Sequence, residues 1–381
     1  MPEISKTSAH VVEAMSIKYN TMVYEMKAAG HHVTVMSLGE AYFDIPLMPF
    51  DDLPFPDIYH YSHSRGIPEL RTKIAEYFRT QYGANFDPTS EIIITAGSKA
   101  AIYMSLMSII DPGDEVLYSE PAWVSYPEQV RLCHGTPIGL PYDQPVTGFE
   151  DYITSKTKAI IIANPHNPRG YVFSPEELEH LLGLARKHNL WLLCDEAYSD
   201  FATNNSFVSL AKMDPEKSHS IVFNSLSKNF GFSGWRLGYV ISNPNLIFEA
   251  LKINQHLITC PATILEHYVC KHFDEILSIT KPQIAALIEH RQKVARYMDK
   301  IGLKYLDGSA TFYFFVSLNA SKLGSEEFAT TLLQRHHVAV VPGLGYGPSC
   351  DRFIRVSIGA ASLEENMRGL DQIKNLIQQT S

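Results

Sequence analysis

The chain has 381 residues, of which 45% are hydrophobic and 19% charged, and its formal net charge is −9 at pH 7. This length predicts two domains or one large core, and the composition is typical of a globular protein. The acidic balance and the absence of a basic stripe in the sequence argue against a nucleic acid as a partner.

The sequence shows no targeting or membrane segment. The first ten residues contain no apolar stretch of signal-peptide length, and no apolar run is long enough to span a membrane. The cysteines, an odd number with no Cys-x-x-Cys pair, do not suit a disulfide framework: Cys133, Cys194, Cys260, Cys270 and Cys350. The histidines include no metal-binding spacing such as His-Glu-x-x-His. We therefore expect a cytoplasmic protein with no membrane partner and no metal.

The chain begins with a helical pattern at roughly residues 10 to 29, and its middle then alternates apolar runs with helical patterns. The runs EIIITAG (91–97) and KAIIIANP (158–165) each precede a helical segment, and LWLLCDEAY (190–198) follows the second one. The second helix starts with a capping box formed by Ser174 and Glu177, with Pro175 at its first position. Such strand–helix–strand units predict a mostly parallel sheet with helices on both faces.

The pattern changes after about residue 275. Residues 281–302 have the periodicity of one amphipathic helix that ends at Gly302, and three strand-like runs follow at 311–318, 336–342 and 352–359. A closing helix, which again begins with a capping box at Ser362, is expected at 362–377. We therefore predict a large domain at 40–275, and a smaller α+β domain formed by 1–39, with the N-terminal helix, and 276–381.

Polar groups follow three of the predicted strands, at the edge where functional groups gather in parallel sheets. Gly97, Ser98 and Lys99 form a helix start that could hold an anion, and Asp195 follows five apolar residues. The third strand leads into Ser225, Ser227 and Lys228. Each feature has an ordinary explanation on its own: a helix start that binds nothing, an N-cap or loop aspartate, and a solvated lysine.

Two other motifs of the sequence resemble sites of other enzyme classes, but neither has the context that its class requires. Ser225-x-x-Lys228 fits the nucleophile motif of penicillin-binding enzymes, but Gly231 and Gly234 follow where that motif needs a helix, and the partner motifs are missing. The glycine-rich run at 343–347 resembles a dinucleotide loop, but Pro348 occupies the position of the third glycine and no βαβ unit follows. This run is interpreted as a turn.

One cofactor needs all three strand ends together. An anion site, a buried carboxylate and a lysine are the protein groups that pyridoxal phosphate requires. The lysine amine forms a Schiff base with the aldehyde, and the carboxylate keeps the pyridine nitrogen protonated. The helix start and the hydroxyls hold the phosphate.

Six segments, in this order along nearly the whole chain, resemble the class I/II aminotransferases of fold-type I, the aspartate aminotransferase superfamily. They are HYSHSRGIPELR (60–71), PGDEVLYSEPAWVSYPEQV (112–130), NPHNPRG (164–170), CDEAY (194–198), SLSKNFGFSGWRLG (225–238) and RFIRVSIG (352–359). The resemblance implies an α/β fold with a large domain, in which helices enclose a mostly parallel seven-stranded sheet, and a smaller α+β domain.

The resemblance also implies roles for individual residues. Lys228 would form the Schiff base and move the proton between the substrate α-carbon and the cofactor aldehyde carbon. Asp195 would pair with the pyridine nitrogen, Asn167 and Tyr198 would hydrogen-bond the ring hydroxyl, and Trp123 would stack on the ring. The phosphate contacts would come from Gly97, Ser98, Lys99, Ser225, Ser227 and Arg236. Lys228, Asp195 and Tyr198 are the implied catalytic residues.

Substrate and partner contacts follow from the same resemblance. Arg355 would bind the substrate α-carboxylate, with help from Asn167, Trp123 and the backbone near Gly39. Tyr61 matches a tyrosine that reaches the phosphate in the neighbouring subunit, which implies a homodimer with shared active sites.

We therefore expect a pyridoxal-phosphate-dependent aminotransferase that moves an amino group between an L-amino acid and a 2-oxo acid. A β-lyase acting on C–S bonds, or an enzyme like aminocyclopropane-carboxylate synthase, is the alternative on the same fold. A binding protein without activity is disfavoured by the intact set of site residues. The sequence departs from the family pattern at three positions, so the identity of the substrate stays open: Arg169, Ala310 and Tyr42. Tyr42 is expected to shape the substrate pocket.

Overall fold

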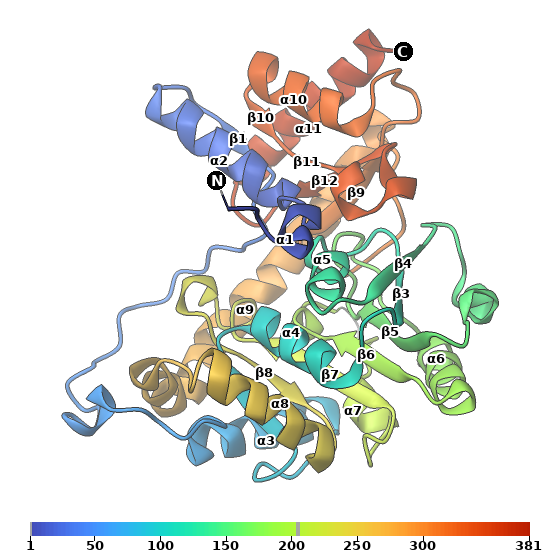
Figure 1. Cartoon of the computed structure of the whole chain (residues 1–381). Coiled ribbons are helices and arrows are strands. Elements are labelled where there is room, and N and C mark those ends of the chain that lie inside the picture. The colour runs from blue at the N-terminus through green and yellow to red at the C-terminus, as the bar shows by residue number, and fades with distance from the viewer. Residues whose placement is uncertain (1, 203–205) are drawn as a thin grey trace.

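The computed structural model describes residues 2–202 and 206–381 and is built around a seven-stranded sheet (Figure 1). The strand order is β2-β8-β7-β6-β5-β3-β4, and every neighbouring pair is parallel except those of β8, which is antiparallel to β2 and β7. The strands are β2 (Ile92–Thr95), β3 (Glu115–Ser119), β4 (Thr136–Leu140), β5 (Thr157–Ala163), β6 (Trp191–Asp195), β7 (Ser220–Ser225) and β8 (Gly238–Ile241). This arrangement confirms the predicted sheet.

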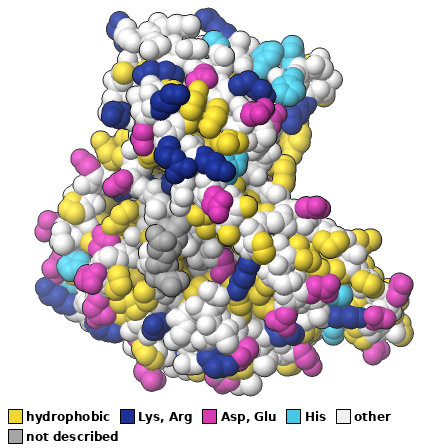
Figure 2. All heavy atoms as spheres, turned by 180° about the vertical axis from the view of Figure 1, so that it is seen from behind, with side chains coloured by type: hydrophobic (Ala, Val, Ile, Leu, Met, Phe, Trp, Pro, Cys, Tyr) yellow, Lys and Arg dark blue, Asp and Glu magenta, His cyan; other side chains and the backbone are white. Residues whose placement is uncertain are grey.

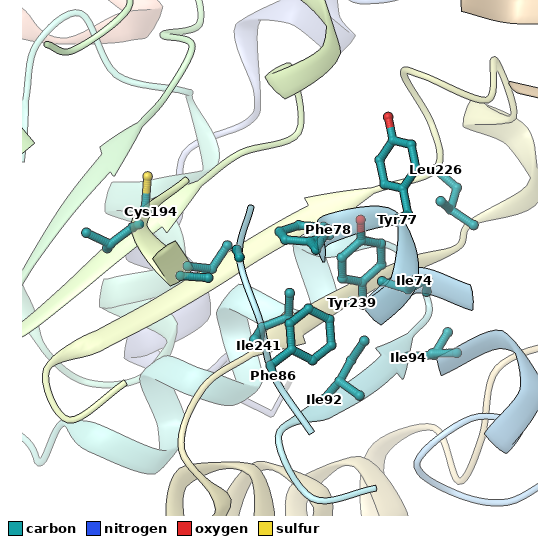
Figure 3. Packing of buried hydrophobic residues seen from close by; sticks show 14 of the residues in the cluster. Ile74, Tyr77, Phe78, Phe86, Ile92, Ile94, Cys194, Leu226, Tyr239 and Ile241 are labelled. Atoms are coloured by element: carbon teal, nitrogen blue, oxygen red, sulfur yellow. The ribbon is translucent and has the colours of Figure 1, made fainter. Parts of the chain in front are cut away.

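Helices cover both faces of the sheet, which explains why the strands are apolar throughout. One face packs on α4 (Ser98–Ile109), α5 (Ser125–Leu132) and α8 (Pro244–Leu257). The other face packs on α3 (Pro68–Tyr82), α6 (Pro175–His188), α7 (Leu210–Met213) and the first part of α9 (Thr263–Ile301). Successive strand residues alternate between the two cores: Ile92 and Ile94 belong to the same cluster as the α3 residues in Figure 3, whereas Ile93 belongs to the core on the opposite face.

A second core joins the two ends of the chain in a smaller domain, at the top of Figure 1. An antiparallel sheet has the order β11-β12-β9, and β1 pairs in parallel with β10. The elements are α2 (Met15–Ala28), β1 (Thr34–Val35), β9 (Tyr313–Ser317), α10 (Ser325–His336), β10 (Val338–Ala339), β11 (Val341–Pro342), β12 (Phe353–Ser357) and α11 (Leu363–Gln379). The short helix α1 (Lys6–His10) has no buried residue and lies against α5 of the large domain.

Two predicted helices differ from those observed. The N-terminal helix is interrupted between α1 and α2, where the backbone N–H of Val12 donates to a carboxylate oxygen of Glu128 (3.0 Å). The helix predicted at 281–302 is the second part of α9, which begins at Thr263, is kinked at His272 where the backbone is not helical (φ −100°, ψ 16°), and contains Pro282. Residues 263–280 of α9 contribute to the core of the large domain and residues 284–301 to the second core, so this helix joins the two domains. The boundary predicted between residues 275 and 276 falls within it, and the predicted division at this residue remains a proposal.

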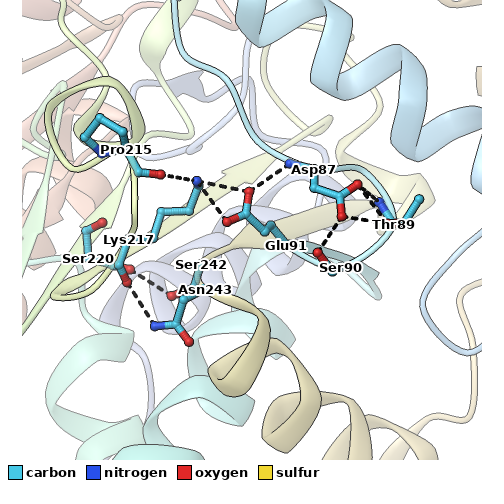
Figure 4. A network of polar contacts seen from close by, with 9 residues as sticks. All are labelled: Asp87, Thr89, Ser90, Glu91, Pro215, Lys217, Ser220, Ser242 and Asn243. Atoms are coloured by element: carbon cyan, nitrogen blue, oxygen red, sulfur yellow. Dashed lines mark hydrogen bonds and ion pairs between the residues drawn. The ribbon is translucent and has the colours of Figure 1, made fainter.

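A buried ion pair fixes the outer end of the sheet, opposite the edge that carries the site (Figure 4). The ammonium of Lys217, whose side chain is 2% exposed, lies 3.1 Å from a carboxylate oxygen of Glu91 and donates to the carbonyl of Pro215 (2.6 Å). Glu91 also accepts from the backbone of Asp87 (2.8 Å). Removal of one member of such a pair leaves an unpaired buried charge and costs about 3–5 kcal/mol. The pair therefore holds the segments that lead into β2 and β7.

The surface agrees with the charge analysis. On the face shown in Figure 2, basic and acidic side chains are interspersed, without a continuous basic stripe among the described residues. In the described part of the chain, none of the helices combines the length and the apolar character that crossing a bilayer requires.

Candidate active site

A cavity of about 460 Å³ lies where the strands of the large sheet end and the smaller domain meets them. Its wall contains most of the residues singled out from the sequence: Gly39, Ser98, Lys99, Trp123, Asn167, Asp195, Tyr198, Ser225, Ser227, Lys228, Arg236 and Arg355. Gly97 and Tyr61 are the two predicted residues that do not line it. Among residues 2–202 and 206–381, no group of three or more His, Cys, Asp or Glu side chains is placed to hold a metal.

The start of α4 and the loop before β8 form a tightly packed anion site. Gly97 has a φ of 80°, and a Cβ atom there would lie 2.4 Å from a guanidinium nitrogen of Arg236. A Cβ atom on Gly238 would lie 2.3 Å from the backbone nitrogen of Ser98. Both glycines therefore allow the arginine and the free N–H groups of the helix start to converge. Gly97 acts through this close approach and not through direct exposure to the cavity.

Hydroxyl groups complete the anion site. Arg236 donates to the Ser233 carbonyl (2.7 Å) and to the Ser227 hydroxyl (3.4 Å), which fixes its guanidinium. The Ser225 hydroxyl accepts from the Ser227 backbone (3.2 Å). Arg236 itself has a φ of 57°, a left-handed backbone conformation that directs its side chain back toward α4. The site thus combines a bidentate cation, hydroxyls and helix N–H groups, the chemistry that binds a phosphate.

Asp195 is held at the end of β6, where no cation among the described residues forms an ion pair with it. Its carboxylate accepts from the hydroxyl of Tyr126 (2.9 Å) and from the backbone N–H of Ala197 (3.1 Å). Burial raises its pKa, while these two hydrogen bonds act in the opposite direction. Tyr126 also packs edge-on against Trp123, with ring centroids 5.3 Å apart. Sequence reasoning missed Tyr126, although its position three residues after Trp123 in one helical turn was a usable signal.

Lys228 is the partly buried amine of the site. Its ammonium donates to the carbonyl of Gly39 (2.5 Å) and lies 5.4 Å from the ring centroid of Tyr198. Burial lowers the pKa of Lys228 to about 8, with Glu40 opposing the shift and Arg355 adding to it. A substantial fraction of the amine is therefore neutral close to physiological pH, and a neutral amine can act as a nucleophile or a base.

Two tyrosines that the sequence did not single out surround Arg355. The guanidinium lies 4.6 Å from the ring centroid of Tyr313 and 5.5 Å from that of Tyr346. The Tyr313 hydroxyl also bonds the hydroxyl of Tyr198 (2.7 Å). Burial raises the pKa of Tyr198 well above its usual value, so its hydroxyl keeps its proton. Tyr346 comes from the glycine-rich run at 343–347, and only the fold brings it to this place.

The structure separates Arg355, which lies in β12, from Arg352, which directly precedes that strand. Arg355 lines the cavity and donates to the carbonyl of Ser37 (2.5 Å), whereas its buried Nε has no partner among the described residues. Arg352 points away and donates to the carbonyls of Leu318 and Leu323, both at 2.8 Å. Arg352 is therefore structural, and Arg355 is available to an anion.

Asn167 presents an unused acceptor. Its side-chain oxygen is buried and has no hydrogen-bond partner within the described part of the chain. A buried amide oxygen without a partner is costly, so a ligand that donates or bridges to it would stabilise the site.

The three departures noted in the sequence lie outside the cavity. Arg169 donates to the carbonyl of Asp307 (2.7 Å) and stacks on Tyr171, and the backbone of Ala310 bonds Gly170 (2.8 Å). Tyr42 is 64% exposed and does not line the cavity, so the expectation that it shapes the pocket is wrong. The backbone N–H of Tyr42 donates to the carbonyl of Gly359 (3.3 Å), and α2 lines the cavity instead, with Ser16, Ile17 and Asn20.

Comparisons with known proteins agree with this geometry. A family model described as aminotransferase class I and II matches residues 30–373. An aspartate aminotransferase of Pyrococcus abyssi is 31% identical over 365 residues, covering 92% of this chain and 94% of the relative. An aromatic-amino-acid aminotransferase of Thermococcus litoralis is 31% identical, with coverages of 82% and 84%. The structure of an aspartate aminotransferase from Thermus thermophilus with maleate has a TM-score of 0.88 and 27% identity, covering 99% and 100% of the two chains.

Proposed function

The chain belongs to the class I and II aminotransferases, and from that membership we propose which residues hold its cofactor, move the proton and select the substrate. The protein is a pyridoxal-phosphate-dependent transaminase that acts on amino acids and 2-oxo acids. The single observation that carries the assignment of residues is the convergence of Lys228, Asp195 and Arg236 on one cavity.

The residues of the cavity fit pyridoxal phosphate. Arg236 and the start of α4 suit its phosphate, and Asp195, which forms no ion pair with a described residue, suits a protonated ring nitrogen. The unpaired oxygen of Asn167 and the protonated hydroxyl of Tyr198 suit the ring hydroxyl. When bound, pyridoxal phosphate supplies an aldehyde that carries the amino group and a ring that withdraws electrons from the substrate α-carbon.

We assign the proton transfer to Lys228. Its Nζ takes the proton from the substrate α-carbon, holds it, and returns it on the cofactor side of the site. The lowered pKa supports this role, because a lysine with its usual pKa would be almost entirely protonated at neutral pH. Trp123 lines the cavity, and the Lys99 ammonium lies 5.0 Å from its ring centroid. The ring therefore shields the reacting atoms from water on that side.

We assign the substrate α-carboxylate to Arg355. Its planar guanidinium is confined between Tyr313 and Tyr346, which fixes its orientation before a substrate arrives. The substrate side chain would then extend toward α2, where Ile17 and Asn20 line the cavity. Because the relatives include enzymes named for aspartate and for aromatic amino acids, the donor panel should contain both classes.

The test is the visible absorption spectrum of the purified holoprotein during additions of single L-amino acids, without an oxo acid. Donor amino acids are expected to bleach the yellow band of the bound cofactor, and the matching 2-oxo acid is expected to restore it. Aspartate, glutamate, phenylalanine and tyrosine form the first panel. A band that persists while pyruvate and ammonia accumulate would contradict transamination and indicate β-elimination.

We further propose a homodimer in the cytoplasm. The segment from residue 47 to 61 carries exposed hydrophobic side chains, with Tyr59 and Tyr61 exposed by 75% and 85%, as expected for a surface that a second copy covers. Tyr61 lies away from the cavity of its own chain, which supports a contact with the phosphate in the partner's site. All five cysteines are free thiols, which supports a reducing compartment.

Tyr61→Phe is expected to raise the dissociation constant of pyridoxal phosphate about tenfold, the effect of one hydrogen bond. Tyr59→Phe, on the same exposed segment, is the matched control and should leave it unchanged. Mixing Tyr61→Phe chains with Lys228→Ala chains should restore tight cofactor binding in one site of each hybrid dimer. No recovery in the hybrid, measured by cofactor titration, would show that Tyr61 acts within its own chain or not at all.

A further inference from the structure

A carboxylate outside the cavity ties the lysine loop to the body of the large domain. Asp200 lies in the short helix η3 (Ser199–Phe201), five residues after Asp195. One oxygen of its carboxylate accepts from the hydroxyls of Tyr77 (2.5 Å) and Tyr82 (2.6 Å). The other oxygen accepts from the side-chain amide of Asn229 (2.7 Å). Asn229 is the residue after Lys228.

The hydrogen bonds from Tyr77 and Tyr82 hold the carboxylate of Asp200 in one position. Both lie on α3, whose ring packing is visible in Figure 3, where the Tyr77 hydroxyl points out of the apolar cluster. Burial raises the pKa of each tyrosine well above its usual value, and the adjacent carboxylate of Asp200 adds to the shift. Both hydroxyls therefore remain protonated and donate to Asp200 at every pH where the enzyme works.

Asn229 depends on Asp200 alone. Its side chain is 4% exposed, and its amide oxygen has no hydrogen-bond partner in the part of the chain that the structure describes. Within residues 2–202 and 206–381, the bond to Asp200 is the one hydrogen bond of the Asn229 side chain, and it is charge-assisted. Loss of this bond would leave both ends of the amide unpaired in the interior, beside the reacting lysine.

We propose that Asp200 is a positioning residue, which fixes Lys228 through Asn229 and thereby sets the reach of the lysine amine toward the substrate α-carbon. Asp200, Asn229 and both tyrosines lie outside the cavity lining, so they act on Lys228 and not on the substrate. A displacement of about 1 Å at a reacting group lowers the rate by about 100-fold, so a single remote bond is sufficient. The inference rests on the proposed role of Lys228.

A reciprocal exchange of the two side chains tests the bond. Asn229→Asp places two carboxylates face to face, and kcat/KM is expected to fall by at least about tenfold above neutral pH. Activity should recover as the pH falls, because one carboxyl then takes a proton and can donate it to the other. The double variant Asp200→Asn with Asn229→Asp restores one amide and one carboxylate, and its activity should return to within about threefold of the unaltered enzyme, without the added ionisation.

Two single variants separate positioning from folding. Asp200→Asn is expected to be mild, because Asn229 can turn its amide and use its unpaired oxygen as the acceptor. Asn229→Ala removes the amide without adding charge, so it should lower kcat/KM without a new pH dependence, while thermal unfolding of the apoprotein shows that the variant is still folded at the assay temperature. The rate at which the apoprotein captures added pyridoxal phosphate, followed by its absorbance, reports the placement of Lys228 independently of turnover and should fall in the same variants.

These measurements distinguish a failure of the positioning role from a failure of the proposed function. If Asn229→Ala and Asn229→Asp both capture the cofactor and turn over like the unaltered chain, or if the double variant does no better than Asn229→Asp, the role of Asp200 is wrong. Lys228→Ala is measured beside them. Full activity in that variant would overturn the proposed function itself, whereas an inactive Lys228→Ala beside normal Asn229 variants would overturn only the positioning role.

Discussion

Lys228→Ala is expected to lower kcat for transamination on the order of 10⁴-fold, because it removes the group that moves the proton at the substrate α-carbon. Pyridoxal phosphate should still bind, since Arg236 and the start of α4 hold its phosphate independently of the lysine. The measurement is a single-turnover reaction with a donor amino acid, together with the cofactor content of the purified variant.

Lys228→Arg is the control for charge. A guanidinium keeps the positive charge in the cavity but does not release its proton at any working pH, so this variant should be as inactive as the alanine variant. Turnover within about tenfold of the unaltered enzyme in either variant would contradict the assignment of Lys228 as the base.

Arg355→Leu is expected to lower kcat/KM for amino acids roughly 10²- to 10³-fold, because a charge-assisted contact to the substrate α-carboxylate is lost. Most of the loss should appear in KM. The same variant should no longer distinguish an amino acid from the corresponding amine that lacks the carboxylate, and this loss of discrimination is the specific signature. It is measured by comparing kcat/KM for the two compounds.

Arg352→Leu is the matched control, three residues earlier in the same segment. Arg352 bonds backbone carbonyls of the smaller domain and does not line the cavity, so its loss should lower the melting temperature and leave kcat/KM of the folded protein close to normal. An unchanged preference for amino acids in Arg355→Leu would assign the carboxylate to another group, and Lys99 would be the next candidate.

The parts of the fold that local sequence determines were predictable. Apolar runs buried on both faces identified the parallel strands, and the capping boxes at Ser174 and Ser362 marked the starts of α6 and α11, where both capping boxes are present in the structure. The break in the N-terminal helix was not predictable, because it depends on a carboxylate from Glu128 that is 116 residues away. The full length of α9 was missed because Pro282 falls inside it.

Some residues of the candidate site were likewise predictable from the sequence, and others were not. Lys228, Asp195 and Arg236 stand at strand ends or in a recognisable segment, so the sequence pointed to them. Tyr313 and Tyr346 take their places from contacts across the domain interface, and no short-range pattern distinguishes such tyrosines from core residues. Asp200 was overlooked because its role depends on three bonds from two other segments.

From the kink at His272 onward, α9 runs without interruption into the smaller domain, so the number of residues between the two cores sets their relative orientation. An α-helix turns by about 100° and rises about 1.5 Å with each residue. One residue inserted between the two halves of α9 would therefore rotate the second core by about 100° around the helix axis relative to the first core. Both cores would stay packed, yet Arg355 would swing away from the sheet edge that carries Lys228. A surface loop can change length without such an effect. The length of this helix therefore sets the position of Arg355 relative to Lys228, although none of its side chains lines the cavity.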